Sequence, residues 1–295
     1  MDLAPIVLFV YNRPWHSQQT LEALVKNELA QDSILYVFAD GAKQNSNKED
    51  LNKINQVHSI IAKQKGFKEI HFIKRDRNFG LADNIVTGVT EIVNKYGKII
   101  VLEDDIVTAP YFLRFLNDGL NLYQNSANVY SINSYMFPIE FNKVTTFLSP
   151  LATSSWGWAT WSKKWNAFQN ELTYKNIIQK NPYLQARFNF ADYNYCEMLN
   201  NKNSWAIRWY YSVFIRNGLG LFPTKTLSHH IGFGDSATHV KETFNQMELF
   251  ANKIPVSFTE IIEIDLQDQF LKYFKKPTRL IDLTVRLTNF LLIRK

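Results

Sequence analysis

An α/β fold built on a mostly parallel sheet is the fold class that this sequence predicts. Short apolar runs rich in β-branched residues alternate with segments of helical spacing through the first third of the chain. Runs that are apolar throughout are typical of parallel sheets covered on both faces, and their alternation with helices indicates a doubly wound layer. At 295 residues and 46% hydrophobic content, the chain can bury a full core as one large domain or two small ones.

The expected elements follow one another without long gaps. Apolar runs predict strands over residues 5–11, 34–39, 69–73 and 99–102. Apolar residues spaced three or four apart predict helices between them, over residues 16–26, 49–65 and 81–96. Gly97, directly after the last of these helices, is a typical C-cap residue.

Three carboxylates, Glu103, Asp104 and Asp105, come directly after the fourth strand. Like charges on neighbouring residues repel one another, so such a run needs a reason. A divalent cation is one, because Mg²⁺ and Mn²⁺ prefer oxygen ligands and keep positions open for substrate phosphates. The alternatives are a solvated turn, or Asp105 capping a following helix.

Further polar residues fall where the other strands are expected to end. Arg13, Asp40 and Asn78 each follow a predicted strand, and ligands of open α/β sheets bind at the carboxyl ends of strands. A guanidinium suits a ribose or phosphate, and a carboxylate can accept the N3–H of uracil. Each residue also has an ordinary explanation, as a surface arginine, a turn formed by Asp40 and Gly41, or a loop.

Charge and composition exclude some classes of protein. The net charge of +6 resides entirely in residues 271–295, so the rest of the chain is neutral, unlike a globally basic nucleic-acid binder. The single cysteine, Cys196, favours a reducing compartment. Residues 1–11 have no basic leader, and their apolar run is too short for a signal peptide or a membrane span. A cytoplasmic location is therefore expected.

The C-terminal residues from 254 onward alternate apolar and basic side chains around Pro277. This composition suits a helix lying on an anionic membrane leaflet, which would place the protein on the inner face of the plasma membrane. The alternative is a terminal helix packed on the catalytic domain.

The order of these motifs resembles that of GT-A glycosyltransferases, in particular bacterial family 2 enzymes and the N-acetylglucosaminyltransferase I type. The resemblance rests on Asn-Arg-Pro at 12–14, Asp-Gly at 40–41, Asn-x-Gly-Leu-x-x-Asn at 78–84 and Glu-Asp-Asp at 103–105. Residues 155–161 are similar to an acceptor-side Gly-Trp segment, and residues 231–239 to a late loop over the diphosphate. The resemblance covers residues 5–239.

The resemblance implies a GT-A fold, in which a Rossmann-like nucleotide-binding sheet with helices on both faces merges with a smaller acceptor-binding region. The nucleotide-sugar half would span residues 1–135 and the acceptor half 136–250, followed by the basic amphipathic tail, 251–295.

The resemblance also implies roles for individual residues. Asp105 would bind Mn²⁺ or Mg²⁺ with His239 as a further ligand, although His239 could be an ordinary loop histidine. The nucleotide sugar would contact Arg13, Asp40, Asn78, Asn84, Glu103, Asp104, Ser236 and Thr238. The acceptor sugar would lie against tryptophans, of which at least one is expected in the core: Trp156, Trp158 and Trp161.

One position departs from the family pattern. The N-acetylglucosaminyltransferase type has its catalytic aspartate directly after a tryptophan, whereas Ala206 follows Trp205 here. An inverting transfer needs a group that accepts the proton of the acceptor hydroxyl. The available carboxylates are Asp192, Glu197 and Asp235.

The implied function is a metal-dependent, inverting hexosyl- or N-acetylhexosaminyltransferase. It would move a sugar from a nucleoside-diphosphate donor, UDP in the first instance, to a glycan or polyprenol-linked glycan in bacterial surface polysaccharide synthesis. A sugar-1-phosphate nucleotidyltransferase is the alternative, but residues 12–14 lack its Gly-rich loop. A non-catalytic carbohydrate-binding protein would explain the 7 Trp and 14 Tyr but not the carboxylates.

Overall fold

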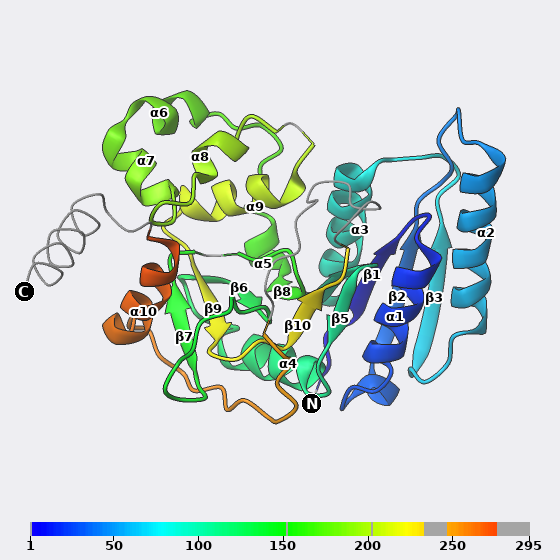
Figure 1. Ribbon diagram of the computed structural model, residues 1–295, viewed down its shortest axis with the longest axis horizontal. Helices are drawn as coiled ribbons and strands as arrows, with labels where there is room; N and C mark the ends of the chain where they lie inside the picture. Colours follow the sequence, from blue (N-terminus) through cyan, green and yellow to red (C-terminus); the bar gives the residue numbers. More distant parts are fainter. Residues whose placement is uncertain (1, 152, 202, 233–246, 276–295) are drawn as a thin grey trace, which may run out of the picture.

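The computed structural model describes residues 2–151, 153–201, 203–232 and 247–275 of the chain. Its centre is an eight-stranded sheet with the strand order β3-β2-β1-β4-β8-β6-β9-β7 (Figure 1). The strands are β1 (Ile6–Val10), β2 (Ile34–Ala39), β3 (Glu69–Lys74), β4 (Lys98–Glu103), β6 (Val129–Asn133), β7 (Thr146–Ser149), β8 (Trp158–Trp161) and β9 (Leu219–Pro223).

The first four strands of this sheet are parallel to one another. β8 runs antiparallel between β4 and β6, and the far edge mixes a parallel β6–β9 pair with an antiparallel β7–β9 pair. The predicted α/β class with a mostly parallel sheet is therefore confirmed, and the four predicted strands lie within a residue or two of β1 to β4.

Helices cover both faces of the sheet. One face packs on α1 (Pro14–Leu24), α2 (Lys48–Lys63) and α4 (Phe112–Leu122), and the other on α3 (Leu81–Tyr96), α5 (Ser162–Trp165) and α9 (Trp205–Phe214). Successive side chains of a strand point to opposite faces, so Ile6 and Leu8 of β1 join the first core while Val7 and Phe9 join the second. This explains why the strand sequences are apolar throughout.

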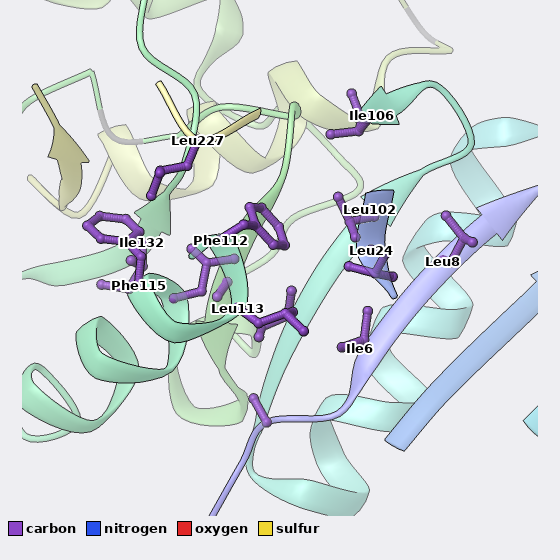
Figure 2. Close-up of a cluster of buried hydrophobic side chains, with 14 of the residues drawn as sticks. Ile6, Leu8, Leu24, Leu102, Ile106, Phe112, Leu113, Phe115, Ile132 and Leu227 are labelled. Atoms are coloured by element: carbon purple, nitrogen blue, oxygen red, sulfur yellow. The ribbon is translucent and has the colours of Figure 1, made fainter. Parts of the chain in front are cut away.

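Figure 2 shows the first core, where α1 and α4 meet the sheet. Phe112, Leu113 and Phe115 of α4 are buried beside Leu24 of α1 and Leu102 of β4. Each fully buried side chain of this kind contributes about 1.5–3 kcal/mol relative to an exposed one. The core thus fixes the position of α1 relative to the end of β4, and with it the position of Arg13, which precedes α1.

A lobe of short helices carries the third hydrophobic cluster. It consists of α6 (Lys175–Lys180), α7 (Pro182–Phe188) and α8 (Tyr195–Met198), drawn at the top left of Figure 1. α10 (Ile264–Phe274) packs on the same cluster and buries Leu266 and Phe270. The expected tail is thus described only as far as residue 275, and residues 276–295 lie outside the described part.

The turn after β4 does not begin a helix. Residues 104–105 form a turn that leads into a short strand, β5 (Ile106–Thr108), so the alternative in which Asp105 caps a helix is wrong. β5 pairs antiparallel with β10 (Ser228–His230), with His230 opposite Ile106. This small second sheet, which the sequence did not predict, places a late segment of the chain beside the carboxylates.

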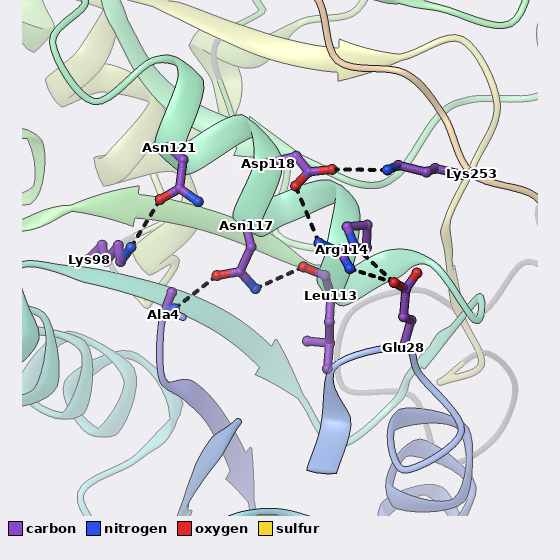
Figure 3. A network of polar contacts seen from close by, with 9 residues as sticks. All are labelled: Ala4, Glu28, Lys98, Leu113, Arg114, Asn117, Asp118, Asn121 and Lys253. Atoms are coloured by element: carbon purple, nitrogen blue, oxygen red, sulfur yellow. Dashed lines mark hydrogen bonds and ion pairs between the residues drawn. The ribbon is translucent and has the colours of Figure 1, made fainter. Parts of the chain in front are cut away.

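The opposite, amino-terminal edge of the sheet is braced by polar contacts (Figure 3). Buried Asn117 of α4 accepts a hydrogen bond from the Ala4 N–H at 2.9 Å and donates one to the Leu113 carbonyl at 2.9 Å. Around it, Arg114 pairs with Glu28 at 2.5 Å. The exposed pairs contribute at most about 1 kcal/mol each, so the buried amide is the stronger constraint.

Within the described residues, no helix combines the length and apolar character that a membrane crossing requires.

Candidate active site

Arg13, Asp104 and Asp105 meet at the carboxyl ends of two neighbouring strands. Arg13 follows β1 and the two aspartates follow β4, its parallel neighbour in the sheet. Arg13 Nη1 lies 2.5 Å from Asp105 Oδ2 and 3.4 Å from Asp104 Oδ1. His230, brought in by β10, places its Nε2 3.2 Å from the same Asp105 oxygen. The structure thus brings together three of the predicted residues and adds a histidine.

The three carboxylates differ in their affinity for protons. Burial alone would raise the pKa of Asp105, but the hydrogen bond and charge of His230, together with Arg13, lower it to about 2. Burial and the negative charge of Asp105 raise the pKa of Asp104 to about 7, against the effect of Arg13. Burial, followed by the charges of Asp105 and Asp104, raises the pKa of Glu103 well above its usual value. The cluster therefore has more carboxyl groups than the single positive charge of Arg13 can neutralise.

Arg13 also has unused hydrogen-bonding capacity. Its Nε and Nη2 atoms are buried and have no hydrogen-bond partner among the described residues. Buried polar groups are nearly always paired, and a guanidinium binds phosphate oxygens through two parallel N–H groups. These two atoms are therefore suited to an incoming anion such as a diphosphate.

The start of the late segment runs directly against this cluster. The Ile231 N–H donates a hydrogen bond to the Asp105 carbonyl at 2.8 Å. At Gly232 a Cβ atom would lie 2.2 Å from Asp105 Oδ2 and 2.5 Å from Arg13 Nη2, so a larger residue would have to displace these side chains or the backbone. The residues predicted for this loop, namely Asp235, Ser236, Thr238 and His239, lie outside the described residues.

Asp40 holds the predicted Asn78 loop against the end of β2. One carboxylate oxygen accepts from the Gly41 N–H at 2.9 Å and the Phe79 N–H at 2.8 Å. The other accepts from Asn78 Nδ2 at 3.1 Å and the Gly80 N–H at 3.0 Å. Asp40 and Asn78 thus meet as expected from their positions, and the carboxylate fixes the loop around them.

Asn84 lies buried on α3 and accepts a hydrogen bond from Arg75 Nε at 3.1 Å. The Arg75 guanidinium lies over the rings of Phe38 and Phe79, at 4.7 and 4.8 Å from their centroids. Arg75 is a further residue of this region that was not predicted from the sequence. Its position directly after β3, in the run Arg-Asp-Arg-Asn before the glycine, is the signal that would have found it.

The three tryptophans of residues 156–161 lie in different surroundings. Trp156 stacks on His230, with ring centroids 4.9 Å apart and planes 18° apart, and so borders the carboxylate cluster. Trp158 is fully buried and stacks on Trp205. Trp161 is also in the core and donates to the Leu120 carbonyl. At least one was expected in the core, and two are there.

Ala206 occupies the position where the resemblance led us to expect the catalytic carboxylate, next to Trp205. Ser204 caps α9, and Trp205, the first residue of that helix, donates its indole N–H to Glu103. Asp192 and Glu197 are exposed on the α6–α8 lobe, the latter in the first turn of α8. That lobe packs in the third hydrophobic cluster rather than around residues 103–105.

A divalent cation would fit this site if substrate phosphates supplied most of its ligands. The described residues contain no group of three His, Cys, Asp or Glu side chains around a common point. Arg13 and His230 both contact Asp105 through its Oδ2 atom. Mg²⁺ in phosphate-binding sites commonly takes only one or two carboxylates, with phosphate oxygens and waters completing its shell. The acid excess of the cluster is consistent with such an ion.

Comparisons with known proteins find no family model and no characterised relative that matches the sequence. A mannosyltransferase from Pyrobaculum calidifontis, solved with GDP-Man and Mn²⁺, aligns over 55% of this chain and 48% of its own at 11% identity, with a TM-score of 0.36. S. aureus TarS aligns over 77% and 36% at 9% identity, with a TM-score of 0.41. A UDP-glucose pyrophosphorylase bound to UDP-glucose aligns over 75% and 90% at 10% identity, with a TM-score of 0.37.

The chain therefore spans about half of the mannosyltransferase and about a third of TarS. With TM-scores below 0.5, these alignments do not determine what this chain does.

Proposed function

We propose that this protein is a metal-dependent, inverting glycosyltransferase of the GT-A type. The observation that carries the proposal is the cluster of Arg13, Asp104, Asp105 and His230 at the carboxyl edge of a parallel sheet, with two buried Arg13 nitrogens unpaired within the described part. Such an edge is where open α/β sheets bind nucleotides. The excess of acid over base in the cluster suits a cation together with a diphosphate.

In this proposal the donor is a nucleoside-diphosphate sugar, with UDP as its nucleotide. Asp40, Asn78 and Asn84 would face the nucleoside, and Arg13 would donate to the diphosphate. Mn²⁺ or Mg²⁺ held by Asp105 would offset the negative charge that develops on the leaving diphosphate. Gly232 would let the backbone of the late segment approach that group closely, and the segment from 233 to 239 would add Ser236, Thr238 and His239.

The acceptor would be a glycan or a polyprenol-linked glycan. Trp156 offers it an aromatic surface beside His230, since Trp158 and Trp161 are buried. The proton of its hydroxyl needs a base. Of the predicted candidates, Asp192 and Glu197 lie on the α6–α8 lobe, which leaves Asp235 of the late segment.

The division of labour along the chain follows from these assignments. Residues 1–135 would hold the donor, residues 136–250 the acceptor, and residues 251–295 would bring the protein to the inner face of the plasma membrane. This placement would suit bacterial surface polysaccharide synthesis on a lipid-linked acceptor.

The test is release of nucleoside diphosphate from a panel of nucleotide sugars in the presence of Mn²⁺. We expect slow hydrolysis of one donor, which falls at least about 100-fold in Asp105→Asn because the cation and Arg13 both lose their anionic partner. Asp268→Asn, in an exposed pair with Lys272, is the matched control and should retain activity.

Unchanged activity in Asp105→Asn would remove the metal assignment. The same assay separates the alternative function, because a nucleotidyltransferase would instead form pyrophosphate from a sugar 1-phosphate and a nucleoside triphosphate.

A further inference from the structure

A groove between α1 and α2 lies outside the site described above. It is shallow and open to solvent, with a volume of about 540 Å³. The two helices lie side by side on one face of the sheet (Figure 1). The side chains that matter here are Trp15 and Gln18 of α1 with Asn52, Asn55, Gln56 and Ser59 of α2.

Trp15 presents its ring to solvent in this groove. It is 58% exposed, and it is the only tryptophan among the large exposed apolar side chains of the described residues. Within the described part of the chain, its ring contacts only the neighbouring His16, edge to face at 4.9 Å. Exposing the apolar face of an indole to water costs free energy, and this flat face is suited to the C–H face of a sugar ring.

The amides facing Trp15 are available for hydrogen bonds. Asn52, Asn55 and Gln56 are exposed, and the side chains of these three residues make no hydrogen bond within the described part of the chain. A carboxamide carries a donor and an acceptor side by side, which matches adjacent hydroxyl groups of a sugar. None of the groove-lining side chains is charged, so the groove suits a neutral ligand.

A second cavity shows the difference between structural and available amides. This cavity, of about 330 Å³, lies in the α6–α8 lobe and is also lined by Asn and Gln. There Gln179 donates to the Cys196 carbonyl at 3.1 Å, Asn189 accepts from the Cys196 N–H at 2.8 Å, and Asn194 caps α8. Those amides hold the lobe together. In the groove, Gln18 donates to Glu22 at 2.8 Å, but the side chains of Asn52, Asn55 and Gln56 make no hydrogen bond within the described residues.

The start of α1 links the groove to the candidate active site. Trp15 is two residues from Arg13, and Asn12 Nδ2 donates to Asp50 in the first turn of α2 at 3.3 Å. We propose that the α1–α2 groove is a second binding site that takes a neutral saccharide, with Trp15 stacked on a sugar ring and the α2 amides on its hydroxyls. Such a site would hold a sugar chain near the transfer site without taking part in transfer.

The experiment is binding of the full-length protein to a glycan array that carries neutral and anionic chains, followed by titration of the best neutral chain. We expect Trp15→Ala and the double variant Asn55→Ala/Gln56→Ala each to weaken binding at least about tenfold. Tyr183→Ala removes a ring that is 69% exposed on α7 and should bind as the unchanged protein does.

The site is independent of catalysis, so Asp105→Asn should bind the neutral chain with unchanged affinity even when transfer is lost. Thermal unfolding confirms that each variant is folded. The proposal is overturned if no neutral chain binds, if only anionic chains bind, or if Trp15→Ala and the amide variant bind as tightly as Tyr183→Ala.

Discussion

At the scale of the residue, the arrangement around Arg13 decides what the site can do. One guanidinium faces two carboxylates, and a third carboxylate, Glu103, lies beside them. Only Asp105 has a lowered pKa, because Arg13 and His230 both lie on its Oδ2 atom. The remaining acids hold protons until a cation or a change of pH removes them, and this has a measurable consequence for stability.

Asp104 should make the protein less stable as pH rises. Its pKa is about 7 in the folded chain against 3.8 as the ordinary value, so the folded state binds the proton more tightly. Stability from this group is present below pH 4 and is lost as pH rises to about 7. Asp104→Asn stays neutral, so relative to the unchanged protein it should gain on the order of 2 kcal/mol between pH 5 and pH 8.

This pH effect is measured by urea unfolding in EDTA at both pH values. Asp268→Asn serves as the control, because its carboxylate is exposed. An Asp104→Asn variant whose stability tracks that of the unchanged protein at both pH values would contradict the assigned cause.

Gly232 should be coupled energetically to Asp105. An added Cβ would lie 2.2 Å from Asp105 Oδ2, so Gly232→Ala must displace the late segment or the carboxylate. We expect lower thermal stability, and a smaller loss when Asp105→Ala removes the obstructing carboxylate. The double-mutant cycle should give a coupling energy of about 0.5–3 kcal/mol, and strictly additive costs would argue against this contact.

At the scale of the element, β8 and the residues just before it place one tryptophan in the core and another beside the candidate active site. Trp158 points into the core shared by α3, α5 and α9, where its ring is within 6.0 Å of Trp165, Trp205 and Trp209. Trp156, two residues earlier, lies instead against His230. Gly157 between them has a φ of +87° and no room for a Cβ beside Ser134, which is what lets the chain turn there.

These two tryptophans should therefore respond differently to the same substitution. Trp158→Ala should cost about 3–5 kcal/mol of unfolding free energy, because it empties a filled core. Trp156→Ala should cost about 1 kcal/mol, the order of a lost ring contact, while reducing transfer to the acceptor. Urea unfolding and the transfer assay measure the two effects, and similar unfolding costs would contradict the difference in burial.

At the scale of the whole molecule, α10 is the last element of the chain that the structure describes. α10 ends at Phe274 and is held by Leu266 and Phe270 in the third cluster. Residues 276–295 hold five basic residues against one acidic residue, which gives this segment a net charge of +4. Anionic membranes attract such segments by about 1 kcal/mol per basic residue.

Deleting residues 276–295 should therefore remove binding to vesicles that contain anionic lipid while leaving the thermal unfolding temperature nearly unchanged. Flotation of both proteins with anionic and with neutral vesicles measures this. Equal flotation of the shortened protein would place the membrane contact elsewhere.

Much of the nucleotide-binding half could be predicted because its signals are local. Runs such as residues 34–39 and 81–96 were predicted with the bounds of β2 and α3, and Gly97 caps α3 with a φ of +79°. The carboxyl ends of parallel neighbours must meet, so Arg13 could be expected near residues 103–105. Helices α6 and α7 of the lobe carry too few turns for a periodic pattern, and the sequence did not predict them.

The sequence alone determined the alternation of strands and helices and the positions of the polar residues at the strand ends. Both are local signals, because they depend on which residues within a short stretch are apolar. Only the tertiary structure decided that β5 pairs with β10. That contact joins two three-residue strands far apart in the chain, and no periodicity within either one reports it. It brings His230 onto Asp105 and Trp156 onto His230, so the partners that set the charge of the central carboxylate come from the fold.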